Sequence, residues 1–552
     1  MAVQEYGRGM NGALLLVMAL VALGIMALGH RKGFQPSIVI LLVAGAASFI
    51  PAVPRLEMEP HLILGVVMPP LLYAAAVNFS FFTFVRNFTP IVGLGFTLVL
   101  VTTVIIGFFT SWLVPAIGLA GAFVLATVVS PPDTVTIVSH GKELGLPRRV
   151  VAILTGESLV NDAAALTFFS LAVAAAAGTH TFIANPFLLF LYGCVVGIII
   201  GWILGVLAIS VRSLLANPAL ETSLGLILPF AAYFVAESFH ASGVLAVVIA
   251  GFTVAIGSNY GSGRENRGID YRTRTMERQV WPVIETLLEA FVFAYMGLQV
   301  RWVIEDLAET EYSFGEALGL GLLVLLAVIV IRIAWVSALY GKGMFDAWVY
   351  AKRAAVDPSD PRVVRRMQQL ERMQQRQAER EERWRARDER WAERRGGRRG
   401  DDARRERPKR GRDMRQPPRP LTWKESLLVS WTGMRGIVTL AAAGSIPLVI
   451  NNGEDFPGRT LIQFIAFTVA IGTLVVQGLT VPILARRLAI DVTEEDAEEQ
   501  RQLAAAQAAA DSAEGFSAQR EAILIAMRDD LVTDEAARVV LERIDRQEAA
   551  AQ

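Results

Sequence analysis

The chain has 552 residues, of which 53% are hydrophobic, and its mean hydropathy is +0.44. It carries 52 basic and 52 acidic residues, so its formal net charge is zero. This composition excludes a disordered chain, a conventional soluble enzyme and a globally basic protein that binds nucleic acid. The single cysteine, Cys194, excludes an internal disulfide framework.

Apolar runs long enough to cross a membrane recur along most of the chain, since about 20 apolar helical residues span the hydrocarbon core. In chain order the candidate spans lie near residues 12–30, 37–53, 61–78, 89–113, 118–139, 150–178, 184–211, 219–238, 241–258, 280–300, 316–341, 424–449 and 459–486. The sequence therefore predicts an all-α polytopic membrane protein with about 13 transmembrane helices.

Basic residues are concentrated in alternate loops between these spans. An odd number of spans places the two termini on opposite sides of the membrane. If the N-terminus is outside, most loop arginines and lysines lie inside, as the positive-inside rule requires. We therefore expect an external N-terminus and a cytoplasmic C-terminus.

Two hydrophilic segments divide the chain into four parts. Spans 1–11 occupy residues 1–345 and spans 12 and 13 occupy residues 423–488. Between them, residues 346–422 are predicted to form a basic cytoplasmic insertion that is helical at first and then flexible. Residues 489–552 are predicted to form an acidic cytoplasmic tail with one or two short amphipathic helices.

The zero net charge arises from a cancellation between these two hydrophilic segments. Residues 351–420 contain 24 basic and 13 acidic residues, whereas residues 488–552 contain 6 basic and 16 acidic ones. The insertion is either a solvated, salt-bridged helix with a disordered end, which the composition favours, or a segment that contacts anionic lipid. Attraction between insertion and tail is a second hypothesis, which a charge-reversed tail would test.

Ionisable residues inside transmembrane helices are costly, so they indicate a functional site by default. Five such residues lie deep in the predicted spans: Asp133, Glu157, Asp162, Arg332 and Arg435. The alternative for each of them is a structural role in a buried salt bridge or near a helix end.

Asp133 follows Pro131 and Pro132 in the middle of the fifth span. Two successive prolines remove two backbone donors, so the helix must open there. Open carbonyls beside a carboxylate are suitable ligands for a small cation such as Na⁺. The alternative is a proline kink in which Asp133 is only a cap.

The sixth span carries Glu157, Ser158, Asn161 and Asp162 within six residues. Ser158 and Asp162 lie one helical turn apart on the same face. Glu157 and Asp162 diverge by about 140° on an ideal helix, so they do not form a carboxylate pair. Asp162 and Ser158 can thus face a cavity, while Glu157 is free to pair with a cation on another helix.

The twelfth span contains a second irregularity at Gly433-Met434-Arg435-Gly436. Interrupted helices at corresponding positions of two halves indicate an inverted-repeat transporter with its site near the bilayer midplane. We therefore expect two inverted six-helix repeats, spans 1–6 and 8–13, whose discontinuous helices cross.

The string Gly156-Glu157-Ser158-Leu159-Val160-Asn161-Asp162 resembles a signature of the monovalent cation:proton antiporter superfamily. It looks like the electroneutral branch of sodium/proton exchangers, which includes bacterial Na⁺/H⁺ antiporters. Further matching strings are Met68-Pro69-Pro70-Leu71-Leu72, Ala236-Glu237-Ser238-Phe239-His240 and Gly433-Met434-Arg435-Gly436. The resemblance covers residues 12–345 and 421–488.

The resemblance implies how the site residues divide their roles. Asp162 would hold the cation and the proton in turn, with Asp133 and Ser158 as further ligands of the transported Na⁺. Pro132 stands where relatives often have threonine, so its carbonyl remains available while a hydroxyl ligand is lost. Asn161 stands where electrogenic relatives have a second aspartate, which implies exchange of one cation for one proton.

The other intramembrane charges are implied to be structural. Glu157 would form a buried ion pair, and we expect Arg332 to be its partner. Arg435 is the alternative partner, or it neutralises helix ends at the crossing.

The resemblance implies a secondary antiporter of the cell (inner) membrane that exchanges Na⁺ for H⁺ in pH and sodium homeostasis. We expect no enzymatic activity and no cofactor, and the partners are the ions, membrane lipid and a second copy in a homodimer. Li⁺ and K⁺ remain alternative cations, and a K⁺/H⁺ antiporter on the same fold is the first rival. A non-transporting membrane sensor is the second.

Overall fold

The computed structural model describes most of the chain in eleven stretches. These are residues 17–29 apart from residue 19, 36–51, 63–134, 145–178, 185–215, 217–260, 271–356, 421–451, 453–490, 492–528 and 531–551, with the single residues 53, 55 and 141. Two compact units are present, residues 1–336 with 424–552, and residues 337–423. Most of the predicted insertion, residues 357–420, lies outside the described residues, and so does its predicted attraction to the tail.

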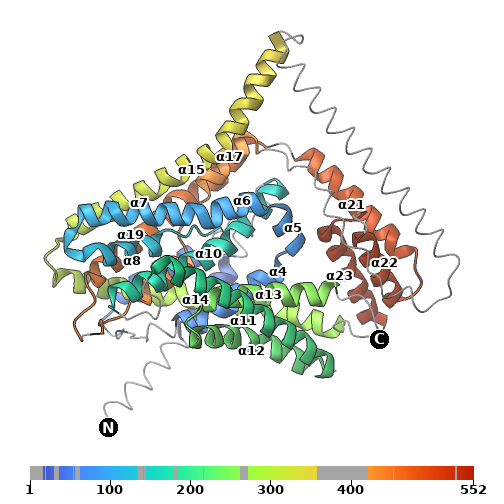
Figure 1. Cartoon of the computed structure of the whole chain (residues 1–552), viewed down its shortest axis with the longest axis horizontal. Coiled ribbons are helices and arrows are strands. Elements are labelled where there is room, and N and C mark those ends of the chain that lie inside the picture. Colours follow the sequence, from blue (N-terminus) through green and yellow to red (C-terminus); the bar gives the residue numbers. More distant parts are fainter. Residues whose placement is uncertain are drawn as a thin grey trace. The chain divides into compact units, whose positions relative to one another are not determined.

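Within the described residues, all regular elements are helices, and backbone bridges occur only as isolated pairs (Figure 1). The first half of the chain contains α2 (Pro36–Ser48), η1 (Ile63–Val67), α4 (Met68–Asn78), α5 (Phe81–Arg86), α6 (Phe88–Val92), η2 (Gly93–Thr97), α7 (Leu98–Leu113), η3 (Pro115–Ile117), α8 (Gly118–Val129), α10 (Arg148–Ala176), α11 (Pro186–Leu215), α12 (Pro218–Ser238) and α13 (Gly243–Tyr260). The second half contains α14 (Tyr271–Ala308), α15 (Phe314–Val356), α17 (Trp423–Trp431), α18 (Ile437–Gly444), α19 (Arg459–Thr473), η5 (Leu474–Gly478), α20 (Leu479–Leu488), α21 (Thr493–Asp511), α22 (Phe516–Arg528) and α23 (Asp534–Ala551).

Seven of the described helices are long and apolar enough to cross a membrane, and five shorter apolar helices accompany them. The prediction of an all-α polytopic membrane protein is therefore confirmed, while the count of about 13 spans stays a prediction. The two longest helices extend past their predicted spans, since α14 begins at Tyr271 and α15 continues to Val356. Apolar composition marks only the part of a helix inside lipid, so polar turns beyond it escape such a search.

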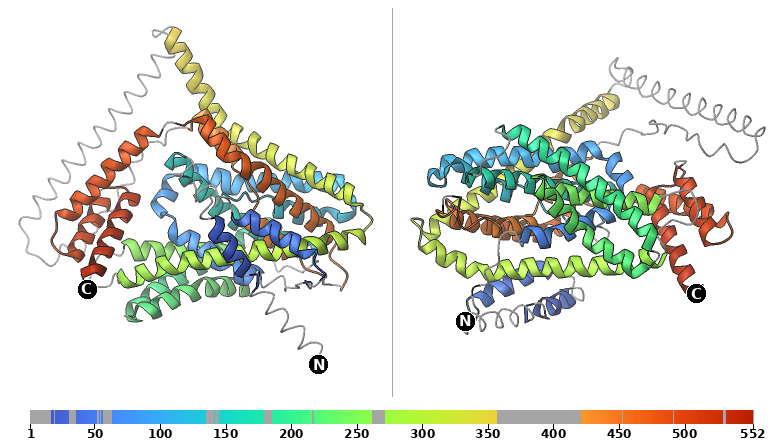
Figure 2. Two further views of the ribbon diagram at one scale, coloured as in Figure 1. Left: turned by 180° about the vertical axis from the view of Figure 1, so that it is seen from behind. Right: turned by 60° about the horizontal axis from the view of Figure 1, so that its bottom comes forward.

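Several helices pack around Asp133 and its neighbours. α8 packs on α7, α10 and α19, and α18 packs on α19. α11 packs on α13 and α12, while α14 packs on α2 and also on α12, α18 and α19 (Figure 2). The stripe of glycines on α11 explains one close approach, because a Cβ atom at Gly201 would lie 2.2 Å from the Ala246 carbonyl oxygen.

The tail contains three helices, α21, α22 and α23, which is one more than the one or two predicted, because α21 was missed. The buried core of this bundle is formed by small and aliphatic side chains: Ala506, Ala510, Ile523, Ala526, Val532, Ala536, Ala537, Val540 and Ile544. Alanine is apolar but weakly so, and the Ala-rich segment of α21 therefore gave little periodic signal.

Candidate functional site

Two interrupted helices meet at the centre of the candidate site. The chain leaves α8 at Val129, and the α17–α18 pair is interrupted between Trp431 and Ile437. At the meeting point the Asp133 backbone N–H donates to the Met434 carbonyl oxygen at 2.5 Å, as an isolated antiparallel bridge. The interruption of the twelfth span is thus confirmed. Residues 135–140 of the fifth span lie outside the described residues, so a second half-helix there stays a prediction.

The Asp133 carboxylate lies at the N-terminal end of α18. Its Oδ2 accepts a hydrogen bond from the Ile437 backbone N–H at 3.3 Å. The first N–H groups of a helix have no intrahelical partner and carry partial positive charge, so a carboxylate is favourable there. Gly436 makes this approach possible, because a Cβ atom on it would lie 1.8 Å from Asp133 Oδ2.

Asn161 and Thr134 attach the opened segment to α10. The Asn161 side-chain amide donates to the Pro132 carbonyl oxygen at 2.5 Å, and the Thr134 hydroxyl donates to the Leu154 carbonyl oxygen at 2.9 Å. The Asn161 amide therefore uses one of the two lone pairs of the Pro132 carbonyl oxygen, and the second lone pair accepts no hydrogen bond from the described residues. The Asn161 Oδ1 atom is buried and has no hydrogen-bond partner within the described part of the chain.

Asp162 is half-buried on α10, one residue beyond Asn161. Its carboxylate is close enough to that of Asp133 for the two charges to repel each other. Across the described residues, no hydrogen bond or ion pair from another side chain reaches it. Ser158 lies one turn earlier on α10 and is buried. Asp133, Pro132, Asn161 and Asp162 thus come together, with Ser158 on the adjoining turn.

Glu157 points away from this group into a buried ion pair with Arg332 of α15. Two hydrogen bonds of 2.5 and 3.2 Å join the two side chains, which are fully buried. Arg332 also donates to the Val429 carbonyl oxygen at 3.0 and 3.3 Å, near the C-terminal end of α17. A positive charge is favourable at the C-terminus of a helix and a negative charge at the N-terminus. The C-terminal end of α17 thus receives the Arg332 guanidinium, and the N-terminal end of α18 receives the Asp133 carboxylate.

Arg435 is buried but does not pair with Glu157. Its Nη1 donates to the Gly433 carbonyl oxygen at 3.4 Å, and its backbone N–H donates to the Thr473 hydroxyl at 2.8 Å. Its Nε has no hydrogen-bond partner in the described stretches. Arg435 therefore places a positive charge beside the interrupted backbone. This position suits the second role predicted for it, neutralising helix ends at the crossing.

Several contributors had no signal in the sequence. Thr473 lies within the apolar helix α19, and Thr134 follows the break without any motif of its own. Glu289 is different, because it lies inside the predicted span 280–300 and its sequence context favours a structural role. It accepts a hydrogen bond from Ser37 at 2.7 Å and lies within electrostatic range of Asp133.

Comparisons with known proteins identify the family of the chain. A family model described as "Sodium/hydrogen exchanger, transmembrane" matches residues 16–351 and 414–487. An uncharacterized Na⁺/H⁺ exchanger of Mycobacterium tuberculosis is 28% identical over 91% of this chain and 80% of its own length. The Na⁺/H⁺ antiporter ApNhaP of Aphanothece halophytica is 25% identical over 86% of this chain and 74% of its own length.

Two further similarities concern ion range and fold. A sodium, potassium, lithium and rubidium/H⁺ antiporter of Bacillus subtilis is 25% identical over 85% of this chain and 61% of its own length. The solved structure of the sodium proton antiporter MjNhaP1 from Methanocaldococcus jannaschii covers 86% of this chain and 98% of its own, with a TM-score of 0.57 and 15% identity. At that identity the match speaks for the fold alone.

Proposed function

The chain belongs to the sodium/hydrogen exchanger family and is a cation/proton antiporter, and we propose that it exchanges one Na⁺ for one H⁺. The string Gly156–Asp162 predicted a member of the monovalent cation:proton antiporter superfamily, and this prediction is confirmed. The protein is accordingly a transporter and not an enzyme.

The observation that supports the proposal best is the placement of Asp162 beside the crossing of the two interrupted helices. The Asp133 carboxylate lies within electrostatic range of Asp162 and repels it. The preceding residue, Asn161, carries a buried Oδ1 without a hydrogen-bond partner in the described residues and binds the Pro132 carbonyl oxygen through its amide. Oxygen ligands suit Na⁺, and an added positive charge relieves the repulsion between the carboxylates. We include Ser158 in this set because its hydroxyl lies one turn away.

The proposed mechanism is competition for one carboxylate. Asp162 binds either Na⁺ or a proton, and both occupied forms are neutral, so the site carries the same charge in either direction. Asp133 is held by the Ile437 N–H and keeps its charge throughout. One cation then exchanges for one proton, and the inverted repeats alternate the access of the site.

Transport assays with different cations test this function. We expect proton efflux from everted vesicles, followed by dequenching of a pH-sensitive dye, when Na⁺ is added but not when choline is added. In proteoliposomes the Na⁺-driven rate should be the same at imposed potentials of either sign, because the exchange is electroneutral. A response to K⁺ without Na⁺ would favour the K⁺/H⁺ antiporter, and no response to Na⁺, Li⁺ or K⁺ would favour the sensor.

Gly436→Ala is expected to reduce exchange at least about tenfold, a cost of about 1.4 kcal/mol in the transport step. The new methyl group would occupy the place of Asp133 Oδ2 and push that carboxylate off the α18 terminus. Gly319→Ala on α15 is the matched control, since nothing lies within 4 Å of its Cβ position. Equal exchange rates for both variants at equal protein levels would contradict the placement of Asp133.

We also propose a cell-membrane location with an external N-terminus, a cytoplasmic C-terminus and a homodimeric assembly. Arg148, Arg274 and Arg278 support this orientation, because all three contact the C-terminal tail. Basic residues thus collect on the side that holds the tail, as the positive-inside rule requires. Reporter fusions at either end of the chain would check it.

A further inference from the structure

The turn between α12 and α13 is fixed against α11. The Tyr192 hydroxyl of α11 donates to the Phe239 carbonyl oxygen at 3.0 Å. The Ser242 backbone N–H donates to the Gly193 carbonyl oxygen at 3.1 Å. The turn also lies close to the glycines of α11, since a Cβ atom on Gly197 would lie 2.7 Å from the Ser242 carbonyl oxygen. The turn therefore belongs to the unit in which α11, α12 and α13 pack on one another.

The backbone of this turn is strained. His240 has a φ of 53°, in the left-handed region that favours glycine. Strain of this kind persists where the surrounding contacts hold the backbone in place, and it is concentrated at functional positions. Two residues later, the Ser242 side chain contacts α10.

A chain of hydrogen bonds runs from α13 to the backbone beside Asp162. The Leu245 backbone N–H donates to the Ser242 hydroxyl oxygen at 3.3 Å, and the Ser242 and Thr167 hydroxyl oxygens lie 2.8 Å apart. The Thr167 hydroxyl donates to the Ala163 carbonyl oxygen at 2.7 Å. Because each hydroxyl has one proton, Ser242 is the donor between the two hydroxyls. The chain thus ends on the residue that follows Asp162 in α10.

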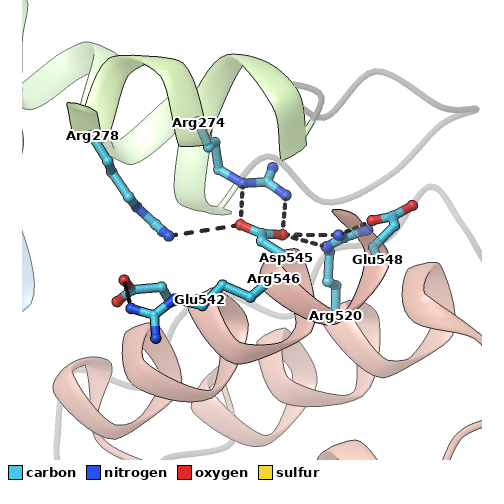
Figure 3. Close-up of polar contacts among 7 residues, drawn as sticks. All are labelled: Arg274, Arg278, Arg520, Glu542, Asp545, Arg546 and Glu548. Atoms are coloured by element: carbon cyan, nitrogen blue, oxygen red, sulfur yellow. Dashed lines mark hydrogen bonds and ion pairs between the residues drawn. The ribbon is translucent and has the colours of Figure 1, made fainter. Parts of the chain in front are cut away.

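Arginines at the ends of two membrane helices mark one side of the protein. Arg148, the first residue of α10, pairs with Glu499 of the tail. Arg274 and Arg278, near the start of α14, lie 2.8 and 3.8 Å from the carboxylate of Asp545 in α23 (Figure 3). We call this the tail side.

The Thr167–Ser242 pair lies on the other side of Asp162. Since α10 begins at Arg148 on the tail side, Thr167 lies about 7.5 Å further along the helix than Asp162, at 1.5 Å per residue. Ser242 is buried and Thr167 is half-buried. Water therefore competes little for their hydrogen bond, which is stronger in such surroundings than at an exposed surface.

The pair joins a helix of the candidate site to helices outside it. α10 carries Asp162, whereas none of the proposed cation ligands lies on α11, α12 or α13. In transporters with inverted repeats, one bundle of helices moves against another around the site. A movement that exposes Asp162 between α10 and the α12–α13 turn must therefore break the bond between Thr167 and Ser242.

We propose that the Thr167–Ser242 pair is an interhelical latch, which positions α10 and closes the path to Asp162 from the side opposite the tail until it opens. Thr167 and Ser242 are positioning residues, because they act on the site through α10. This inference rests on the proposed Na⁺/H⁺ exchange, through which the opening of the latch is measured. The contact itself is measured separately by cross-linking.

Removal of one hydroxyl tests the latch through the sidedness of Na⁺ binding. Thr167→Val keeps the shape of the side chain and removes its hydroxyl. The conformation open to the side opposite the tail then becomes more populated, so the apparent KM for Na⁺ on that side should fall about fivefold. Fivefold corresponds to about 1 kcal/mol, the usual net value of one hydrogen bond. The KM on the tail side should change far less, as measured in right-side-out and everted vesicles.

Two variants on the same helix are the matched controls. The Thr155 hydroxyl donates to the Val151 carbonyl oxygen at 2.9 Å, and among the described residues it forms no hydrogen bond to another helix. Thr155→Val thus removes a comparable hydroxyl without touching the latch, and Thr167→Ser keeps the latch hydroxyl. Both should keep the KM values of the unmodified protein. An unchanged KM in Thr167→Val, or an equal fall on both sides, would overturn the latch.

A cross-link tests whether the pair must open during transport. The chain has one cysteine, so Thr167→Cys/Ser242→Cys is made in a Cys194→Ser background. Hydroxyl oxygens 2.8 Å apart put the two side chains within reach of a disulfide. Oxidation with copper phenanthroline should form this disulfide and lower exchange at least about tenfold, or about 1.4 kcal/mol. Reduction with dithiothreitol should restore exchange.

The two single-cysteine variants, treated with the same oxidant, are the controls and should keep their exchange rates. Exchange that persists in the cross-linked protein would overturn the latch, because the pair would then not need to open. Absence of the cross-link would contradict the contact itself. If the unmodified protein shows no Na⁺ exchange, the proposed function is refuted, whereas the cross-link would still report the contact.

Discussion

Replacement of Asp162 by asparagine is expected to abolish cation-dependent proton flux while the protein still inserts and folds. Asparagine cannot take up a proton in the relevant pH range and carries no charge to bind Na⁺, so both transported ions lose their shared site. The flux should fall to the level of vesicles without the protein. That is a loss of at least about 100-fold, or about 2.8 kcal/mol. The measurement is dye dequenching in everted vesicles.

Asp133→Asn is the informative comparison for this variant. Asparagine keeps an oxygen that can accept the Ile437 N–H, so the crossing should persist while Na⁺ loses an anionic ligand. We expect the KM for Na⁺ to rise with flux retained at saturating Na⁺. Glu305→Gln, at an exposed i,i+4 pair of α14, is the neutral control. Substantial Na⁺-dependent flux in Asp162→Asn would refute the assignment of Asp162.

Arg332→Gln is expected to destabilise the protein strongly, by about 3–5 kcal/mol. It leaves the Glu157 carboxylate fully buried without its partner, and it removes two bonds to the Val429 carbonyl oxygen. Glu157→Gln should have a similar effect because it leaves a buried guanidinium unpaired. The measurement is the apparent Tm of detergent-solubilised protein, followed by the size-exclusion peak of the intact species.

The double variant Glu157→Gln/Arg332→Gln decides between a structural and a transporting role for Glu157. With both charges removed, no unpaired charge remains, so the apparent Tm should recover part of the loss and exchange should persist. Arg301→Gln is the control for a surface pair, where we expect a change of about 0–1 kcal/mol. Loss of exchange in a stable double variant would place Glu157 among the transporting residues.

Much of the candidate site could be predicted because its cause is local. Pro131 and Pro132 cannot continue a helix, so the break beside Asp133 follows from covalent structure. The spacing of Glu157 and Asp162 similarly separates them on any helix, and the structure buries one in an ion pair while the other adjoins Asp133. Residues near in sequence and on one element thus obey rules that need no tertiary contact.

The choice between Arg332 and Arg435 could not follow from such rules. Both arginines lie in apolar spans, and only the packing of α15 against α10 and α17 brings Arg332 to Glu157. Gly433 allows that approach, since a Cβ atom there would lie 2.3 Å from the Arg332 side chain. The capping of the Pro132 carbonyl by Asn161 likewise joins two elements, and no sequence motif reports it.

The sequence by itself determined that this is a polytopic helical membrane protein with two interrupted spans and a set of intramembrane charges. Apolar length, proline and the cost of charge in lipid act on each segment separately, so one chain is enough to recognise them. Only the tertiary structure decided which charges meet. The Arg274–Asp545 pair joins positions 271 residues apart, and its formation depends on the path of every helix between them. The net charge of zero gave no hint that tail acids bind arginines at the ends of membrane helices, because composition carries no information about distance.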